Sequence, residues 1–184
     1  MEAKKIVITG GATRIGAAIS KSLVNFGTKI SIHYNKSKNS AEKLKKDLEE
    51  LGAEVYLFKA DLNNFKQTHG LIRKAYKKMK GLDCLINNAS IFENDNLVNF
   101  SEKSFSKHIN INLRAPAILI QNFNRLVKNN EGCIINIIDQ RIEKLTPFFS
   151  HRSIIISLNK CLCSPVIEPT QLAYTRLESP LIFA

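Results

Sequence analysis

The sequence predicts an α/β fold in which a doubly wound parallel sheet carries helices on both faces. Short apolar runs suited to buried strands alternate strictly with segments in which apolar residues recur at helical spacing. A glycine-rich turn follows the first apolar run, and further glycines stand where most of the predicted helices end. This alternation is typical of parallel sheets, because each crossover between two parallel strands needs a long connection, usually a helix.

The predicted strands are short and rich in apolar or β-branched residues. The first contains the run Ile6-Val7-Ile8, which suits a strand buried on both faces, and the second alternates in polarity. Right-handed crossovers place the five strands in the order 3-2-1-4-5. The strands are predicted at residues 5–9, 29–34, 54–59, 82–87 and 133–138.

The predicted helices each place apolar residues on one face. The first extends from the glycine turn to Phe26 and ends at Gly27. Gly52 and Gly81 stop the second and third, as C-cap glycines commonly do. The remaining helices are predicted at residues 40–51, 65–80 and 102–128.

Length and composition predict a single globular domain. The chain has 184 residues, of which 44% are hydrophobic. No apolar run is long enough to span a membrane, and the first residues lack the pattern of a signal peptide. The four cysteines form no Cys-x-x-Cys pair, so we interpret them as reduced packing residues rather than metal ligands. We therefore expect a cytoplasmic protein with no metal site and no membrane partner.

The net charge of +11 has two interpretations. It is compatible with a basic nucleic-acid-binding protein. However, the lysines are spread along amphipathic helices, and no basic motif interleaved with aromatic residues occurs. We favour a solvated helix surface over a nucleic-acid partner, and a positive field would also help to capture a polyanionic cofactor.

The turn after the first strand has the residues that a pyrophosphate site needs. A pyrophosphate binds backbone N–H groups at a helix N-terminus, where the helix dipole favours anions. Gly10 permits the tight turn, and Gly16 permits close packing of the helix on the sheet. A plain structural turn is the alternative, but the position between a strand and a helix favours a Rossmann-type dinucleotide site. Its predicted contacts are Gly10, Arg14, Ile15 and Gly16.

The end of the second strand indicates which dinucleotide binds. A site that prefers NAD usually has an acidic residue there for the ribose 2′-hydroxyl. This chain instead has a lysine next to a serine, which suits a 2′-phosphate and therefore NADPH. An ordinary polar turn is the alternative. The predicted contacts are His33, Tyr34, Asn35, Lys36 and Ser37.

Two further strand ends contribute candidate cofactor contacts. Asp61 and Leu62 follow the third strand, where they would lie near an adenine ring. Asn88, Ala89 and Ser90 follow the fourth strand. An asparagine can tie adjacent strand ends together, and small residues leave room for a cofactor.

These residues together resemble the short-chain dehydrogenase/reductase family, and within it the pteridine reductase branch. The resemblance covers about residues 4–149. It lies in Thr-Gly-x-x-x-Arg-x-Gly, His-Tyr-x-x-Ser, Asp-Leu, Asn-Asn-Ala-Ser, Asn112 and an aspartate, Asp139, where most relatives have the catalytic serine. The branch also has an arginine at the position of Arg14 and a serine at that of Ser90.

The resemblance implies hydride transfer from NADPH to a C=N or C=O bond of a pterin-like or carbonyl substrate. Asn112 would organise a water in the proton relay, and Asp139 would hydrogen-bond or protonate the pterin. Arg14 and Ser90 would lie near the cofactor phosphates and the substrate. Because family members often pair through the fourth helix, residues 102–128 are a candidate surface for a homo-oligomer.

The sequence departs from the family after about residue 149. The family's catalytic tyrosine and lysine would fall at positions that hold Arg152 and Ile156, and no Tyr-x-x-x-Lys occurs in the chain. Residues 150–184 contain no glycine and lack the later strands of the family. We interpret residues 1–149 as an NADP-binding domain and residues 150–184 as an atypical tail, produced by truncation or by a change of reading frame.

Three functions remain open at this point. The main prediction is an NADPH-dependent oxidoreductase of this family whose catalysis is impaired. A non-catalytic NADPH-binding remnant of such an enzyme is the alternative, and the absent tyrosine and lysine favour it. A basic nucleic-acid-binding protein is a distant third.

Overall fold

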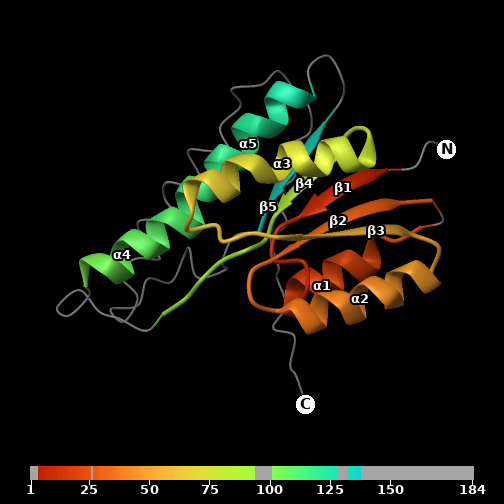
Figure 1. The fold of residues 1–184 in the computed structure, drawn as a ribbon, viewed down its shortest axis with the longest axis horizontal. Helices are drawn as coiled ribbons and strands as arrows, with labels where there is room; N and C mark the ends of the chain where they lie inside the picture. The colour runs from red at the N-terminus through yellow and green to blue at the C-terminus, as the bar shows by residue number, and fades with distance from the viewer. Residues whose placement is uncertain (1–3, 26, 94–100, 128–131, 138–184) are drawn as a thin grey trace.

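The structure, a computed structural model, describes residues 4–25, 27–93, 101–127 and 132–137 (Figure 1). Five parallel strands form one sheet in the order β3-β2-β1-β4-β5, which confirms the predicted Rossmann-type order. The predicted absence of later family strands concerns residues outside the described ones. The strands are β1 (Lys5–Ile8), β2 (Lys29–Tyr34), β3 (Glu54–Lys59), β4 (Cys84–Asn87) and β5 (Cys133–Asn136).

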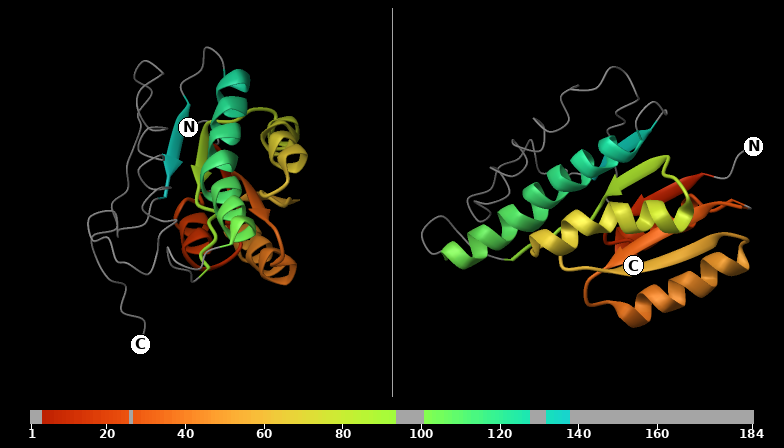
Figure 2. Two further views of the ribbon diagram at one scale, coloured as in Figure 1. Left: turned by 90° about the vertical axis from the view of Figure 1, so that its left-hand side faces the viewer. Right: turned by 45° about the horizontal axis from the view of Figure 1, so that its top comes forward.

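Helices cover both faces of the sheet (Figures 1 and 2). One layer contains α1 (Arg14–Ser22) and α2 (Lys38–Glu50). The other contains α3 (Phe65–Met79) and a long helical unit formed by α4 (Glu102–Ile109), the π-helical η1 (Asn110–Arg114) and α5 (Ala115–Leu126). The two layers bury separate apolar clusters because successive side chains of each strand point to opposite faces.

The alternation along β1 shows how the apolar run becomes two cores. Val7 points into the cluster with Ile72, Leu119 and other residues of α3 and α5, whereas Ile8 points into the cluster with α2. Both side chains are almost completely inaccessible to solvent. The sheet is therefore covered by helices on both faces at β1.

Several predicted boundaries differ from the structure by one to four residues, and the largest difference is at the end of α1. Helix α1 ends at Ser22 rather than at Phe26. Gly27 does not cap it; the Gly27 N–H donates to the carbonyl of Gly52, with φ of +81°. The fifth strand ends at Asn136 rather than at residue 138. Gly27 therefore links the loop before β2 to the loop before β3. Apolar residues at helical spacing do not distinguish such a loop glycine from a glycine that ends a helix.

The predicted helix at 102–128 is interrupted by the π-helical segment η1. The Ala115 N–H donates to the carbonyl of Asn110, five residues earlier. Pro116 explains the widening, because it has no N–H to donate to the carbonyl of Asn112, four residues earlier. The segment places Asn112 between the two α-helical parts, and π-helical turns are frequent at functional sites.

The described ranges contain no helix that is long and apolar enough to cross a membrane. The same ranges contain no cluster of three or more potential metal ligands. Cys84 and Cys133 lie in register on neighbouring strands and form no disulfide within the described residues. Burial, followed by the neighbouring Cys133, raises the pKa of the Cys84 thiol, so Cys84 remains protonated at neutral pH.

Candidate functional site

The candidate dinucleotide site lies along the carboxyl edge of the sheet. In parallel α/β sheets, ligands bind outside the carboxyl ends of the strands, near the point where the strand order reverses. Here that point lies between β1 and β4, because β2 and β3 extend the sheet on the opposite side of β1. The structure gathers at this edge the predicted residues that follow β1, β2, β3 and β4.

The glycines of the first turn make room that no other residue would leave. A Cβ on Gly16 would lie 2.2 Å from the carbonyl oxygen of Gly10 and 2.7 Å from the side-chain nitrogen of Asn88. A Cβ on Gly10 would lie 3.0 Å from the Cα of Ala89, and Gly10 has a φ of +61°. The turn and the start of α1 therefore pack directly against the end of β4, at distances that only glycine permits.

The N-terminus of α1 fits an anion. Thr13 occupies the N-cap position but makes no side-chain hydrogen bond to the helix, and the first turn contains no acidic residue. Arg14, the first helical residue, has a left-handed φ of +51° and an exposed side chain. Ile15 is also exposed, at 46%, although it is a large apolar residue. Free backbone N–H groups, the helix dipole and the guanidinium all favour negative charge here.

His33 is hydrogen-bonded to the glycine turn that follows β1. Its side chain is 3% exposed, its Nδ1 accepts from the Gly10 N–H at 3.1 Å, and its Nε2 lies 3.0 Å from the carbonyl of Ala60. The acceptor role of Nδ1 assigns the proton to Nε2, which donates to Ala60. Both ring nitrogens are thus committed to backbone groups. This geometry makes His33 a buried support of the glycine turn, and its predicted contact with a cofactor stays a prediction.

The pKa of His33 links this contact to pH. Burial is the largest influence and lowers the pKa below its ordinary value of 6.5, against the opposing effects of the Ala60 carbonyl and Asp61. Above pH 6.5 the imidazole is neutral in the folded and unfolded chain, so it adds no pH dependence. Below pH 6.5 the unfolded chain gains a proton that the folded chain resists, and the free energy of unfolding falls.

We therefore expect the folded protein to lose stability as the pH falls from 6.5 through the lowered pKa of His33. The loss attributable to this residue approaches about 1.4 kcal/mol per pH unit. Urea unfolding of the wild type and of His33→Gln, measured between pH 5 and 8, tests this. Parallel curves for the two proteins across the range would show that His33 does not titrate as described.

The end of β2 presents a basic and uncharged polar surface. Tyr34 is half-buried, whereas Asn35 and Lys36 are exposed. Ser37 precedes α2, and the first turn of α2 contains no acidic residue. No carboxylate is therefore placed by this loop or this helix turn to accept from a ribose 2′-hydroxyl, and Lys36 is free to meet a phosphate.

The loop after β3 separates the two residues predicted there. Asp61 is half-buried and forms a tight turn, in which its carboxylate accepts from the Asn63 N–H at 2.9 Å. Leu62 is only 4% exposed and its side chain belongs to the core beside α3. Only the backbone of Leu62 can therefore reach a cofactor, whereas Asp61 lies at the rim of the site.

Asn88 ties the end of β4 to the glycine turn. Its side-chain nitrogen donates to the carbonyls of Thr9 and Gly10, at 3.0 and 3.1 Å. The hydroxyl of Thr9 accepts from the N–H groups of Asn88 and Ala89, each at 3.0 Å. Ser90 follows with an exposed side chain. Thr9, the first residue of the Thr-Gly-x-x-x-Arg-x-Gly motif, was not among the predicted contact residues, although the motif itself signalled it.

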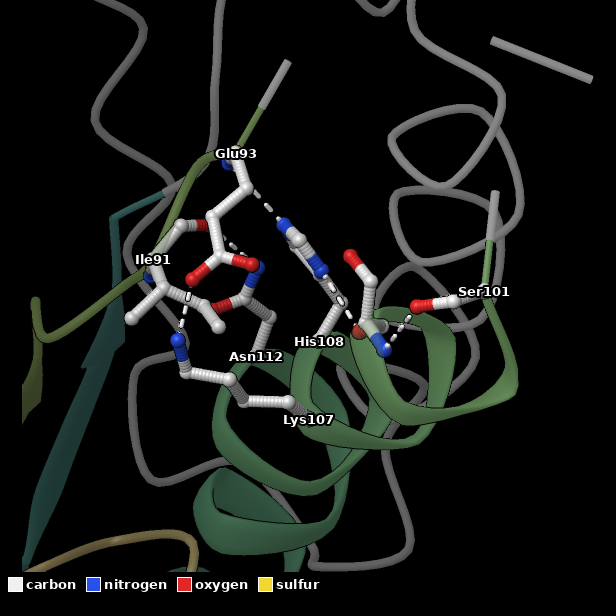
Figure 3. A network of polar contacts seen from close by, with 7 residues as sticks. Ile91, Glu93, Ser101, Lys107, His108 and Asn112 are labelled. Atoms are coloured by element: carbon white, nitrogen blue, oxygen red, sulfur yellow. Dashed lines mark hydrogen bonds and ion pairs between the residues drawn. The ribbon is translucent and has the colours of Figure 1, made fainter. Parts of the chain in front are cut away.

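The segment after Ser90 is held by the long helical unit (Figure 3). Asn112 donates to the carbonyl of Ile91 and accepts from its N–H, both at 2.9 Å. His108, only 3% exposed, accepts from the N–H of Glu93 at 3.1 Å, and Lys107 pairs with the Glu93 carboxylate. The amide of Asn112 thus fixes the backbone beside the site. His108 is a second residue that the sequence predictions missed.

The remaining predicted site residues lie outside the described ones. These are Asp139, Arg152 and Ile156. Their proposed roles stay predictions, as does the interpretation of residues 150–184 as an atypical tail.

Comparison with known proteins agrees with this geometry. The sequence model of the family described as short chain dehydrogenase matches residues 4–148. The chain belongs to the short-chain dehydrogenase family. A family member from Pestalotiopsis microspora, a short-chain dehydrogenase/reductase, is 32% identical over 114 residues, which are 62% of this chain and 43% of the relative. The chain spans about half the length of the curated relatives it matches.

Solved structures of the same family share the fold. The FolM alternative dihydrofolate reductase 1 of Brucella canis, complexed with NADP, is 30% identical and has a TM-score of 0.77 over 83% of this chain and 62% of its own. A short chain dehydrogenase of Burkholderia cenocepacia, also in complex with NADP, is 25% identical with a TM-score of 0.82, over 88% and 66% of the two chains. Each of these proteins is similar to the chain over its sheet and helices.

Proposed function

We propose that this chain binds NADPH at the carboxyl edge of its sheet. The observation that carries the proposal is the cradle at Gly10 and Gly16, where an added Cβ would meet the backbone at 3.0 Å or less. The pyrophosphate would lie against this cradle and the N-terminus of α1, near Arg14 and Ile15. The two solved relatives in complex with NADP support the same cofactor class.

The other strand ends would hold the rest of the cofactor. Lys36 and Ser37, with Asn35, would bind the 2′-phosphate, since the β2 end and the first turn of α2 offer no acid. Tyr34 and the turn of Asp61 would border the adenosine. Ala89 and Ser90 would lie along the nicotinamide half. When bound, NADPH supplies a hydride.

The proposed reaction class is reduction of a pterin-like or carbonyl substrate. Support comes from the resemblance at Arg14, Ser90 and Asp139 and from the FolM alternative dihydrofolate reductase 1 as a structural relative. Within the chain, Asn112 would fix the backbone of Ile91, which would lie beside the nicotinamide half of the cofactor. Self-association through the long helical unit and the absence of a nucleic-acid partner stay predictions.

A second candidate function is cofactor binding without turnover. It is favoured by one observation, the presence of Arg152 and Ile156 where the family has its catalytic tyrosine and lysine. An arginine stays protonated and cannot cycle a proton. An isoleucine carries no charge that could lower the pKa of a donor or hold a ribose.

Lys36→Asp tests the cofactor preference. A hydrogen bond to a charged group contributes about 1.5–3 kcal/mol, so its loss should weaken NADPH binding roughly tenfold to 100-fold. NADH lacks the 2′-phosphate, and its affinity should stay the same or rise. Calorimetric titration of both dinucleotides into the full chain measures this.

Lys43→Asp provides a matched control, because Lys43 is exposed on α2 and the charge change is identical. It should weaken NADPH binding only slightly. Tighter binding of NADH than of NADPH by the wild type would contradict the assignment of the β2 end. Binding of neither dinucleotide would contradict the proposed function itself.

A further inference from the structure

The π-helical segment η1 also contacts the loop after β3. The side-chain nitrogen of Asn110 donates to the Asn63 side-chain oxygen at 2.9 Å. The Nη2 of Arg114 donates to the Asn63 backbone carbonyl, also at 2.9 Å. Asn63 precedes these two residues by 47 and 51 positions in the chain. Two side chains of one short segment thus converge on a single loop residue.

Asn63 is also hydrogen-bonded to Asp61, the residue at the rim of the site. The Asn63 backbone N–H donates to the carboxylate of Asp61 at 2.9 Å. The Asp61 N–H in turn donates to the side-chain oxygen of Gln67 at 2.8 Å. Asn63 itself is exposed. These bonds therefore bury little apolar surface, and their main effect is to fix the conformation of a surface loop.

Burial of the Arg114 side chain costs free energy that packing alone does not explain. Its Nε is buried and has no hydrogen-bond partner within the described part of the chain. An unsatisfied buried donor costs free energy, which a single bond from Nη2 to Asn63 offsets only in part. An apolar side chain at this position would avoid that cost but would leave the Asn63 carbonyl without its donor.

We propose that Arg114 and Asn110 are positioning residues that hold the 61–64 loop in the form that binds the adenosine half of NADPH. The inference rests on the proposed cofactor site. Because Asn112 lies between them and holds Ile91, η1 fixes the loops after β3 and β4 together. The interruption of the helix would thus serve both halves of the cofactor.

Arg114→Met and Asn110→Ala test the proposal in the full chain, with Arg125→Met as the control. Arg125 is an exposed arginine near the end of α5. The first readout is affinity for NADPH, for adenosine 2′,5′-bisphosphate and for reduced nicotinamide mononucleotide. The second is amide hydrogen exchange of residues 60–68 without ligand, which is independent of cofactor binding.

Arg114→Met should weaken NADPH and adenosine 2′,5′-bisphosphate by the same factor, roughly five- to tenfold, and leave the mononucleotide unchanged. It should also speed amide exchange at residues 60–68. Asn110→Ala should weaken the same two ligands and speed the same exchange to a smaller degree. Arg114→Lys should retain part of the affinity that Arg114→Met loses. Arg125→Met should do neither. A merely structural role would lower the melting temperature without this split between the two halves of the cofactor.

Unchanged exchange and unchanged affinity in a folded Arg114→Met would overturn the inference. Equal loss for all three ligands would overturn it too, since the effect would then be global. If Arg114→Met fails to fold, Asn110→Ala and Arg114→Lys decide by the same criteria. If Arg114→Met exchanges faster but the wild type binds no NADPH, the contact of Arg114 with the loop is supported and the proposed function is contradicted.

Discussion

Gly16→Ala should weaken NADPH binding more than any other conservative change in the described part of the site. The added Cβ would lie 2.2 Å from the Gly10 carbonyl oxygen and 2.7 Å from the side-chain nitrogen of Asn88. Backbone cannot yield as a flexible side chain does, so the start of α1 must move away from Gly10 and Asn88. Overpacking costs about 1–3 kcal/mol. If that cost falls on the binding-competent turn, NADPH affinity drops roughly 5- to 150-fold.

Gly70→Ala is the matched control. Gly70 lies inside α3, and a Cβ there would meet only the end of the Lys74 side chain, at 3.9 Å. The same substitution should raise the melting temperature, because alanine is favoured over glycine within helices by about 0.5–1 kcal/mol. Titration calorimetry with melting curves for both variants checks the prediction. Wild-type affinity in Gly16→Ala would show that the cofactor does not use this turn.

The purified chain should reduce pterin or carbonyl substrates at background rate even when it binds NADPH. Reduction needs a proton donor beside the hydride acceptor, with a pKa tuned toward neutral pH. The expected positions of that donor and of its lysine hold Arg152 and Ile156. General acid catalysis contributes about 10²–10⁴-fold, and poor placement of the nicotinamide ribose should add to the loss.

NADPH oxidation followed by absorbance, with and without a pterin, measures this turnover. Steady oxidation that depends on the substrate and is lost in Asp139→Ala would show that another residue supplies the proton. The prediction of impaired catalysis would then be wrong, while the proposed cofactor site would stand. The same assay with a simple carbonyl substrate separates the two substrate classes.

The sheet could be predicted from the sequence because its information is local. Runs such as Ile6-Val7-Ile8 identify buried strands, and the handedness of crossovers then sets their order. The glycine turn was equally clear, because Gly10 and Gly16 mark a backbone that no side chain may fill. The end of α1 was not, since apolar spacing continues past Ser22 although the helix stops there.

The contacts that support the site could not be predicted because they join distant parts of the chain. Nothing in the sequence pairs Asn63 with Arg114, or Glu93 with His108. His33 was expected to meet the cofactor, but its inward rotamer commits both ring nitrogens to Gly10 and Ala60. One local signal was available and unused: Pro116 inside an apolar helical pattern indicates an interruption, which the structure shows as η1.

The most direct test of NADPH binding at this edge is amide hydrogen exchange of the full chain with and without the cofactor. Saturating NADPH should slow exchange in the segments that follow β1, β2, β3 and β4, namely residues 10–16, 35–38, 60–64 and 88–93. The remainder of α2 and the far end of α3 should not change. Protection confined to other segments, or none at saturation, would contradict the account.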